Sequence, residues 1–350
     1  MKLIRTQDAV GHVLCHDMTQ IIPGEYKGPL FKKGHVVTEE DIPVLLSIGK
    51  EHLYIFEKDE SMLHEDEAAQ ILYEICAGPN MHPTAVSEGK IELIADCDGL
   101  LKVDRDRLIA VNSLGEMMIA SRHGNTTVRK GDKIAGTRVI PLVIEKEKMQ
   151  RAREVTSGGT IFTILPFRVE KAAILTTGSE VYHGRIEDRF TPVIEKKLSE
   201  FGIQVVFHEV FDDDPAMLTD GCLRAIDEGA QMVLCTGGMS VDPDDRTPLA
   251  IRNTGARVVT YGAPVLPGAM FMLAYYEKTN PETGAVTVVP IAGLPGCAMY
   301  AKRTIFDIVL PRLAAGDPVS ANELALLGEG GLCLNCPVCT FPACGFGKKW

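Results

Sequence analysis

The chain has 350 residues, a formal net charge of −11 at pH 7 and 45% hydrophobic residues. A single hydrophobic core rarely extends over so many residues, so we expect two or more domains. The acidic balance and the lack of a Lys/Arg stripe argue against a nucleic-acid groove. The first residues lack the long apolar core of a signal peptide, and no run approaches the roughly 20 apolar residues of a membrane span. We therefore expect a cytoplasmic protein that binds neither nucleic acid nor membrane.

The N-terminal half is predicted to contain two small regions. Residues 1–60 alternate short apolar runs with turn signals, which predicts a β-rich unit with a helix from Thr38 to Gly49 and a strand over 52–56. Residues 61–165 are predicted to form an α+β, barrel-like region. Its expected elements are a helix over 65–75 and strands over 88–95, 99–103, 117–120 and 139–144.

From Lys171 onward the pattern changes to strands that alternate with helices. The predicted strands cover 171–176, 204–207, 232–235, 256–260 and 286–291, and the predicted helices cover 190–201, 215–228, 248–253 and 298–313. This order predicts an α/β domain over residues 171–313, with a doubly wound, mostly parallel sheet. Ligands bind such domains where strands end and helices begin.

Three glycine-containing loops follow predicted strands, at 176–180, 236–240 and 293–297. Backbone amides in such loops can hold a phosphate or carboxylate, although any one loop alone could be an ordinary turn. Acidic residues accompany the loops: Glu180, Asp213, and the crowded group Asp242, Asp244 and Asp245. Crowded carboxylates are costly unless a cation, hydrogen-bond donors or solvent offset them. If Glu180, Asp213 and Asp245 face one crevice, they can hold Mg²⁺ that bridges an anionic substrate.

Six motifs, taken together, are more specific than any single loop. They are Thr177-Gly-Ser-Glu180, Gly184-Arg-Ile-Glu-Asp188, Phe211-Asp-Asp-Asp-Pro215, Thr236-Gly-Gly-Met-Ser-Val241, Pro267-Gly268 and Gly293-Leu-Pro-Gly296. Their order and spacing resemble the molybdopterin-binding domain that molybdopterin molybdotransferases (molybdenum insertases) share with molybdopterin adenylyltransferases. The resemblance covers residues 171 to about 313. Residues 1–60 resemble the insertases' N-terminal region more weakly.

The resemblance implies that these loops bind a pterin dithiolene, molybdopterin, through its phosphate. It further implies that carboxylates and Mg²⁺ assist molybdate insertion or adenylyl transfer, with Glu180, Asp213 and Asp245 as the catalytic acids. The implied ligand-binding residues are Thr177, Gly178, Ser179, Asp188, Thr236, Gly237, Gly238, Ser240, Pro267, Gly268, Leu294, Pro295 and Gly296. A homodimer, and a molybdoenzyme or cofactor-assembly protein as partner, are expected from the family.

The chain also departs from the insertases at several positions. Leu266-Pro-Gly-Ala-Met270 lacks both basic residues of their Lys-Pro-Gly-Lys-Pro motif, and Cys297 replaces the Asn of their Gly-Leu-Pro-Gly-Asn-Pro motif. Ser179 stands where they usually carry Asp, and Asp245-Arg-Thr-Pro248 is closer to the adenylyltransferase loop. Loss of polar groups removes charge stabilisation of an anion. An insertase-like enzyme, a non-catalytic molybdopterin carrier or sensor, and a phosphohydrolase of another nucleotide-like ligand therefore stay open.

Residues 330–350 stand in place of the insertases' C-terminal β domain and contain Cys333, Cys336, Cys339 and Cys344. Four thiols so close together in a reducing compartment favour metal binding over disulfides. The spacing resembles the ferredoxin-type run for an iron–sulfur cluster, although the fourth cysteine follows after four residues rather than three. A Zn²⁺ ion held by four cysteines is the alternative metal, and a flexible thiol-rich tail is the alternative to any metal.

Overall fold

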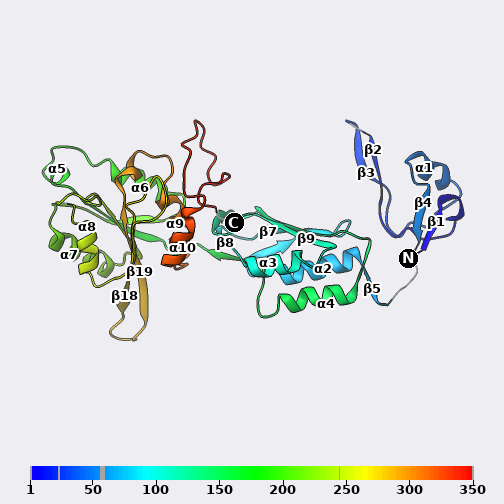
Figure 1. Ribbon diagram of the computed structural model, residues 1–350, viewed down its shortest axis with the longest axis horizontal. Helices are drawn as coiled ribbons and strands as arrows, with labels where there is room; N and C mark the ends of the chain where they lie inside the picture. The colour runs from blue at the N-terminus through cyan, green and yellow to red at the C-terminus, as the bar shows by residue number, and fades with distance from the viewer. Residues whose placement is uncertain (1, 23, 56–59, 244, 349–350) are drawn as a thin grey trace. The chain divides into compact units, whose positions relative to one another are not determined.

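The computed structural model in Figure 1 describes residues 2–22, 24–55, 60–243 and 245–348. Phe56 of the predicted strand and Asp244 of the acidic group lie outside the described residues. The chain divides into two compact units. The first comprises residues 1–96, 103–122 and 130–163, and the second comprises residues 97–102, 123–129 and 164–350. Among the described residues, no helix has the length and apolar character needed to cross a bilayer.

The N-terminal part of the first unit consists of short antiparallel strand pairs and one helix. β1 (Lys2–Arg5) pairs with β4 (His52–Ile55), β2 (Met18–Ile22) pairs with β3 (Tyr26–Phe31), and η1 (Thr6–Asp8) is a single 3₁₀ turn. The helix α1 (Asp41–Ser47) begins later than the predicted start at Thr38. The Asp41 carboxylate accepts hydrogen bonds from the Thr38 amide (2.8 Å) and hydroxyl (2.9 Å), so the predicted capping residues form the turn that precedes the helix.

The rest of the first unit is an open antiparallel sheet with helices along one face (Figure 1). The strand order is β6 (Met81–Pro83), β7 (Lys90–Ala95), β11 (Lys133–Val139) and β9 (Met117–Ser121), and the helices are α2 (Glu65–Cys76), α3 (Arg105–Asn112) and α4 (Lys146–Val155). A further pair joins β5 (Met62–His64) to β12 (Val143–Glu145). The predicted continuous strand over 139–144 is wrong: Pro141 has no amide hydrogen for a strand ladder, and the chain breaks between β11 and β12.

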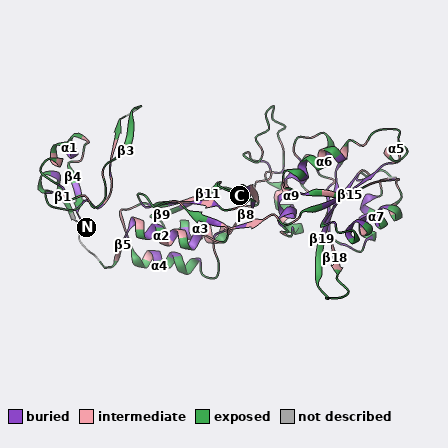
Figure 2. Cartoon of the chain, turned by 180° about the vertical axis from the view of Figure 1, so that it is seen from behind, coloured by how far each residue is buried: buried purple, intermediate pink, exposed green. Residues whose placement is uncertain are grey.

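A six-stranded mixed sheet organises the second unit, in the order β15-β14-β16-β19-β18-β17. The parallel strands are β14 (Lys171–Thr177), β15 (Gln204–Phe211), β16 (Met232–Thr236) and β19 (Val286–Leu294). β18 (Met272–Thr279) runs antiparallel to β19 and to β17 (Arg257–Tyr261). The predicted mostly parallel α/β sheet is confirmed. Buried residues fill its centre, while the outer ends of β18 and β19 are largely exposed (Figure 2).

Helices cover both faces of this sheet, because strands such as β16 carry apolar side chains on both faces. Met232 and Leu234 point into a core with α6 (Phe190–Ser199) and α9 (Ile305–Ala314). Val233 and Cys235 point into a second core with α7 (Pro215–Asp227) and α8 (Thr247–Asn253). Successive side chains of a strand face opposite sides, so a fully apolar strand requires cover on both faces. The remaining helical turns are α5 (Ser179–Tyr182), η2 (Gly296–Met299), α10 (Ala321–Ala325) and η3 (Leu326–Gly328).

The predicted continuous helix over 298–313 is wrong. The turn η2 ends at Met299, and α9 begins only at Ile305. Thr304 sets that start, because its hydroxyl accepts a hydrogen bond from the Phe306 amide (3.2 Å), and the Asp307 carboxylate accepts one from the Thr304 amide (2.8 Å). This reciprocal capping box leaves residues 300–303 outside any helix.

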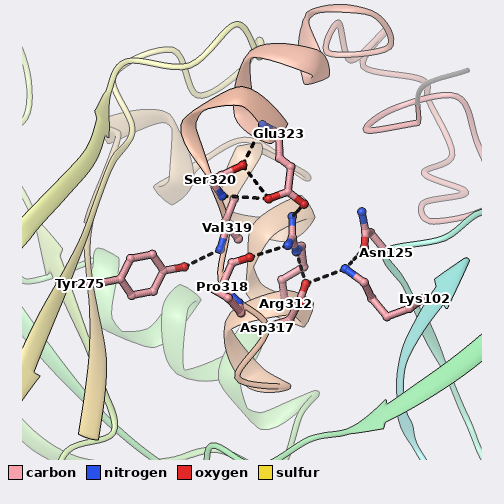
Figure 3. A network of polar contacts seen from close by, with 9 residues as sticks. All are labelled: Lys102, Asn125, Tyr275, Arg312, Asp317, Pro318, Val319, Ser320 and Glu323. Atoms are coloured by element: carbon pink, nitrogen blue, oxygen red, sulfur yellow. Dashed lines mark hydrogen bonds and ion pairs between the residues drawn. The ribbon is translucent and has the colours of Figure 1, made fainter. Parts of the chain in front are cut away.

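A polar network fixes the chain that follows α9 (Figure 3). The Arg312 guanidinium is buried, pairs with Asp317, and lies 2.7 Å from the Glu323 carboxylate. Asp317 also accepts a hydrogen bond from Lys102 (2.8 Å). Lys102 belongs to β8 (Gly99–Val103), which pairs with β10 (Thr126–Val128) in a three-stranded sheet that also contains β13 (Phe162–Pro166). The network therefore ties the segment before α10 to α9 and to this small sheet.

We predict that Glu323→Gln weakens the acid dependence of stability. Burial raises the pKa of Glu323, but the Ser320 hydrogen bonds and the Arg312 charge lower it from 4.5 to about 2. The folded-state pKa is therefore below the unfolded value. The stabilisation is fully present above about pH 4.5 and is lost as the pH falls toward 2. At neutral pH the free energy of unfolding of the variant should be lower by on the order of 1 kcal/mol, a modest value because the Glu323 side chain is partly exposed. Urea denaturation at several pH values measures the free energy of unfolding, with the exposed Glu329→Gln variant as control. The same pH dependence of this free energy in both variants would contradict the prediction.

Candidate functional site

The loops after β14 and β16 touch each other at the carboxyl edge of the sheet. Gly237 has φ +83°, and a Cβ atom there would lie 2.1 Å from the Thr177 carbonyl oxygen. The Thr247 hydroxyl, at the start of α8, lies 3.2 Å from the Thr177 hydroxyl and donates to the Gly237 carbonyl (3.0 Å). Only glycine fits both this close approach and this backbone conformation. Sequence-distant loops are thereby held in one fixed arrangement.

Carboxylates from three loops gather beside this crossing. The Ser179 amide donates a hydrogen bond to Asp213 (2.9 Å), which follows β15. Burial raises the pKa of Asp213, and the negative charges of Glu180, Asp212 and Asp245 raise it further, against the lowering effect of the Ser179 hydrogen bond. The structure thus brings the predicted acids Glu180 and Asp245 within electrostatic reach of the third, Asp213. Asp212 is a fourth member that the sequence reading did not single out.

The Gly-Gly loop closes on Asp245. The Ser240 amide donates a hydrogen bond to the Asp245 carboxylate (3.1 Å), and the Tyr261 hydroxyl donates to the Met239 carbonyl (3.2 Å). The next residue, Arg246, lines a small cavity with Thr177 and Asp213. Arg246 was missed from the sequence as a site residue, although the adenylyltransferase-like Asp-Arg-Thr-Pro motif contains it. A cation beside the acidic group can help to hold an anionic ligand.

Asp188 accepts hydrogen bonds from its neighbours through both carboxylate oxygens. One carboxylate oxygen accepts hydrogen bonds from the amides of Phe190 (2.8 Å) and Thr191 (3.1 Å) at the start of α6, and the other accepts from the hydroxyls of Thr176 (3.0 Å) and Thr191 (2.6 Å). Burial acts to raise the pKa of Asp188, but these hydrogen bonds outweigh it and lower the pKa. Thr236 is fully buried, and its hydroxyl donates to that of Thr176 (3.1 Å). Both residues hold the β14 and β16 ends in place.

The other predicted binding residues differ in how accessible they are. The exposed or partly exposed ones are Ser179, Gly237, Gly238, Ser240, Pro267 and Gly296, and the buried ones are Thr177, Gly178, Gly268, Leu294 and Pro295. Gly268 is buried because it packs on α9: a Cβ atom there would lie 2.6 Å from the Ile305 side chain. A ligand can therefore contact the first set directly, whereas the second set shapes the loops.

The four C-terminal cysteines line one cavity of about 460 Å³, together with Pro267, Lys302 and Arg303. Cys336 and Cys339 are exposed, while Cys333 and Cys344 are partly buried. Among the described residues, no group of three or more His, Cys, Asp or Glu side chains is arranged to hold a metal ion. Metal binding by these cysteines therefore stays a prediction.

Comparison with known proteins assigns the domain that carries the site. Residues 173–315 match the family described as "Probable molybdopterin binding domain". Residues 173–315 belong to this domain family. The molybdopterin-binding domain thus includes every acid of the site and implies a pterin ligand, as the motifs indicated. Residues 3–57 match a different family, described as "Domain of unknown function (DUF8806)".

Individual relatives resemble only part of the chain. The molybdenum cofactor biosynthesis bifunctional protein of Synechococcus elongatus is 33% identical over 85 residues, which cover 24% of this chain and 27% of that protein. A CinA-like protein of Mycobacterium sp. (strain JLS) is 32% identical over 158 residues, covering 40% of this chain and 37% of its own. The tungsten cofactor synthesizing protein MoaB from Pyrococcus furiosus is 20% identical, with a TM-score of 0.32, and the match covers 42% of this chain and 89% of MoaB. The chain therefore spans well under half the length of these two curated relatives.

We predict that Gly237→Ala destabilises the molybdopterin-binding domain more than Gly255→Ala does. Both glycines have left-handed backbones, with φ +83° and +81°, but a Cβ atom at Gly255 would meet nothing within 4 Å. Both variants should lose about 1–2 kcal/mol from backbone strain. Gly237→Ala should lose about 1–3 kcal/mol more, because the added methyl group overlaps the Thr177 carbonyl. Denaturant unfolding of the two variants tests this, and equal losses would show that the loops do not meet as described.

Proposed function

We propose that the chain is an insertase-like enzyme of molybdenum-cofactor assembly, which transfers molybdate to adenylylated molybdopterin. The observation that carries the proposal is the convergence of Glu180, Asp213 and Asp245 from three loops of a molybdopterin-binding domain. Converging carboxylates beside an anion-binding loop suit chemistry in which a cation offsets the charge of a phosphorylated substrate.

The glycine loops supply the anion-binding side of the proposed site. Gly237 and Gly238 expose the backbone where β16 ends, and Gly296 is exposed at the start of η2. A phosphate can approach the Gly296 backbone closely, because a Cβ atom there would meet nothing within 4 Å, whereas Thr177 and Thr247 fill the space beside Gly237 and Gly238. Arg246 contributes a cation beside Asp213, in the small cavity that both residues line with Thr177. We infer that the pterin phosphate lies against these loops and that the reacting end of the ligand faces the acids.

The acids suit Mg²⁺ on the ground of their charge and chemistry. Magnesium usually takes only one or two carboxylates and completes its shell with substrate phosphates and water, so a three-ligand protein cage is not required. Burial is the main cause of the raised pKa of Asp213, and the negative charges of Glu180, Asp212 and Asp245 add to it; a bound cation would relieve this added repulsion. No three of the described acids are arranged to hold a metal ion by themselves, so one or two of Glu180, Asp213 and Asp245 would hold it together with the substrate phosphate and water. The ion would neutralise phosphate charge and polarise oxygens of the substrate.

The chain's own contribution is to hold the acids in place. The Ser179 amide orients Asp213, and the Ser240 amide orients Asp245. Each carboxylate accepts this bond through one of its two oxygens. Preorganised charges need no rearrangement when the substrate binds, so they favour the transition state over the free substrate.

A second candidate function is that of a non-catalytic carrier or sensor of molybdopterin. The segment Leu266–Met270 carries no basic side chain, and Leu266 is 56% exposed where insertases usually have Lys. Without these charges, pterin binding would persist while stabilisation of transferred molybdate is lost. A carrier would pass its pterin on to a molybdoenzyme or to another assembly protein.

We predict that Asp213→Asn and Asp245→Asn each lower formation of mature cofactor on the order of 100-fold. The assay supplies the purified chain anaerobically with adenylylated molybdopterin, Mg²⁺ and molybdate, and quantifies bound pterin and mature cofactor. Asp220→Asn changes an exposed acid of α7 and is the matched control, expected to retain full turnover.

Three results would reject the enzyme proposal. Pterin binding without turnover in the unmodified chain would select the carrier. Binding of an ordinary nucleotide but no pterin would favour the phosphohydrolase. Turnover that survives both Asp→Asn substitutions would show that the acids do not act in the reaction.

A further inference from the structure

We propose that Cys333, Cys336, Cys339 and Cys344 hold an iron–sulfur cluster in the cavity that the C-terminal segment forms against the molybdopterin-binding domain. All four cysteines line this single cavity of about 460 Å³. Four thiolates are the usual ligand set of such clusters. This inference does not depend on the proposed insertase activity, because it rests on a different part of the molecule.

The C-terminal segment is folded onto the domain. The Leu266 amide donates to the Gly331 carbonyl (2.8 Å), and the Cys333 amide donates to the Leu266 carbonyl (2.8 Å). The other end of the segment returns to its start, since the Gly347 amide donates to the Gly330 carbonyl (2.9 Å). A closed loop fixed at both ends presents its side chains to one space, as a cluster site requires.

Aromatic side chains form an apolar wall of the cavity. Phe341 and Phe346 both line it, their ring centroids lie 6.1 Å apart, and Phe346 is only 5% exposed. Cys333 and Cys344 pack against the same hydrophobic core as Phe346. Partial exclusion of water is one of the factors that set the reduction potential of a protein-bound cluster.

Two cations stand beside the cysteines. The Lys302 ammonium donates to the carbonyls of Cys336 (2.9 Å) and Pro337 (3.0 Å). The Arg303 guanidinium lies over the Phe341 ring at 5.2 Å and lines the same cavity as Cys339. These contacts hold the Cys336 backbone and the Phe341 side chain in place at the wall of the cavity. Both cations come from residues 302–303, which lie between η2 and α9.

The arrangement suits a cluster better than a single ion. A Zn²⁺ ion needs four sulfurs about 2.3 Å from one point. In the part of the chain that the structure describes, no three His, Cys, Asp or Glu side chains are arranged to hold a metal ion, so either metal requires the cysteine side chains to turn toward the cavity centre. A cluster places several irons and sulfides between its thiolates, so it bridges cysteines spread around a wider cavity. The two spacers of two residues match the ferredoxin-type run, whereas the last spacer has four residues in place of three.

The cavity borders segments of the predicted pterin site. Pro267 lines the cavity and belongs to the Pro-Gly motif of the molybdopterin-binding domain, and Tyr300 follows directly after the turn η2 that contains Gly296. The segment also pairs with Leu266, where the insertases' first lysine would stand. A cluster in this cavity would therefore lie next to loops expected to contact the pterin.

The test uses the full chain, purified without oxygen and reconstituted with ferrous iron and sulfide. We expect about four iron and four sulfide per chain, with visible absorption that bleaches on reduction. The double variant Cys336→Ser/Cys339→Ser should bind no cluster. Both residues are exposed, so its circular dichroism and unfolding midpoint should match those of the unmodified chain. Cys297→Ser is the control, because Cys297 lies outside the cavity lining, and it should retain the cluster.

Several results would overturn the inference. They are a chain that binds one Zn²⁺ and no sulfide, a chain that binds no metal after reconstitution, and a cluster that persists in the double variant. Metal content is independent of molybdate transfer, so failure here leaves the proposed function untouched, and failure of turnover leaves this inference untouched.

Discussion

The close contact between Gly237 and the Thr177 carbonyl is the constraint on which the site depends. It requires a residue without a side chain after β16, and it fixes the loops of β14 and β16 against each other and against Thr247 of α8. The contact also brings two of the acids toward each other, since Glu180 and Asp245 lie on the loops that it joins. Because β14 lies between β15 and β16, Asp213 joins them from the third strand end. The contact between the two loops thereby helps to position these acids at one edge of the sheet.

The balance of charge at this edge decides which activity the domain can support. The acids are retained, and Arg246 adds a cation to the cavity beside Asp213. At Leu266, however, the cysteine segment pairs with the chain where insertases usually carry a lysine. The folded, thiol-rich segment lies there with the cations Lys302 and Arg303 beside it.

The parts of the fold that the sequence predicted are those with a strong periodic pattern. β16 is apolar from Met232 to Cys235 and ends at paired glycines, and α7 has apolar residues at helical spacing, so both were recognised. α3 was missed because only Val111 is buried on it, which leaves no apolar stripe to detect. β18 was missed because its buried and exposed halves give no single pattern. The motifs predicted Glu180, Asp213 and Asp245, whereas Asp212 and Arg246 emerged only from spatial proximity, which a linear pattern does not contain.

Equilibrium binding of molybdopterin tests the central claim most directly. The purified chain would be titrated anaerobically with molybdopterin, with and without Mg²⁺, beside the Asp213→Asn variant. The account predicts that Mg²⁺ strengthens binding to the unmodified chain and strengthens it much less in the variant, because the ion bridges the acids and the ligand's phosphate. Absence of binding, or binding that is indifferent to both Mg²⁺ and Asp213, would contradict a pterin site at this edge of the sheet.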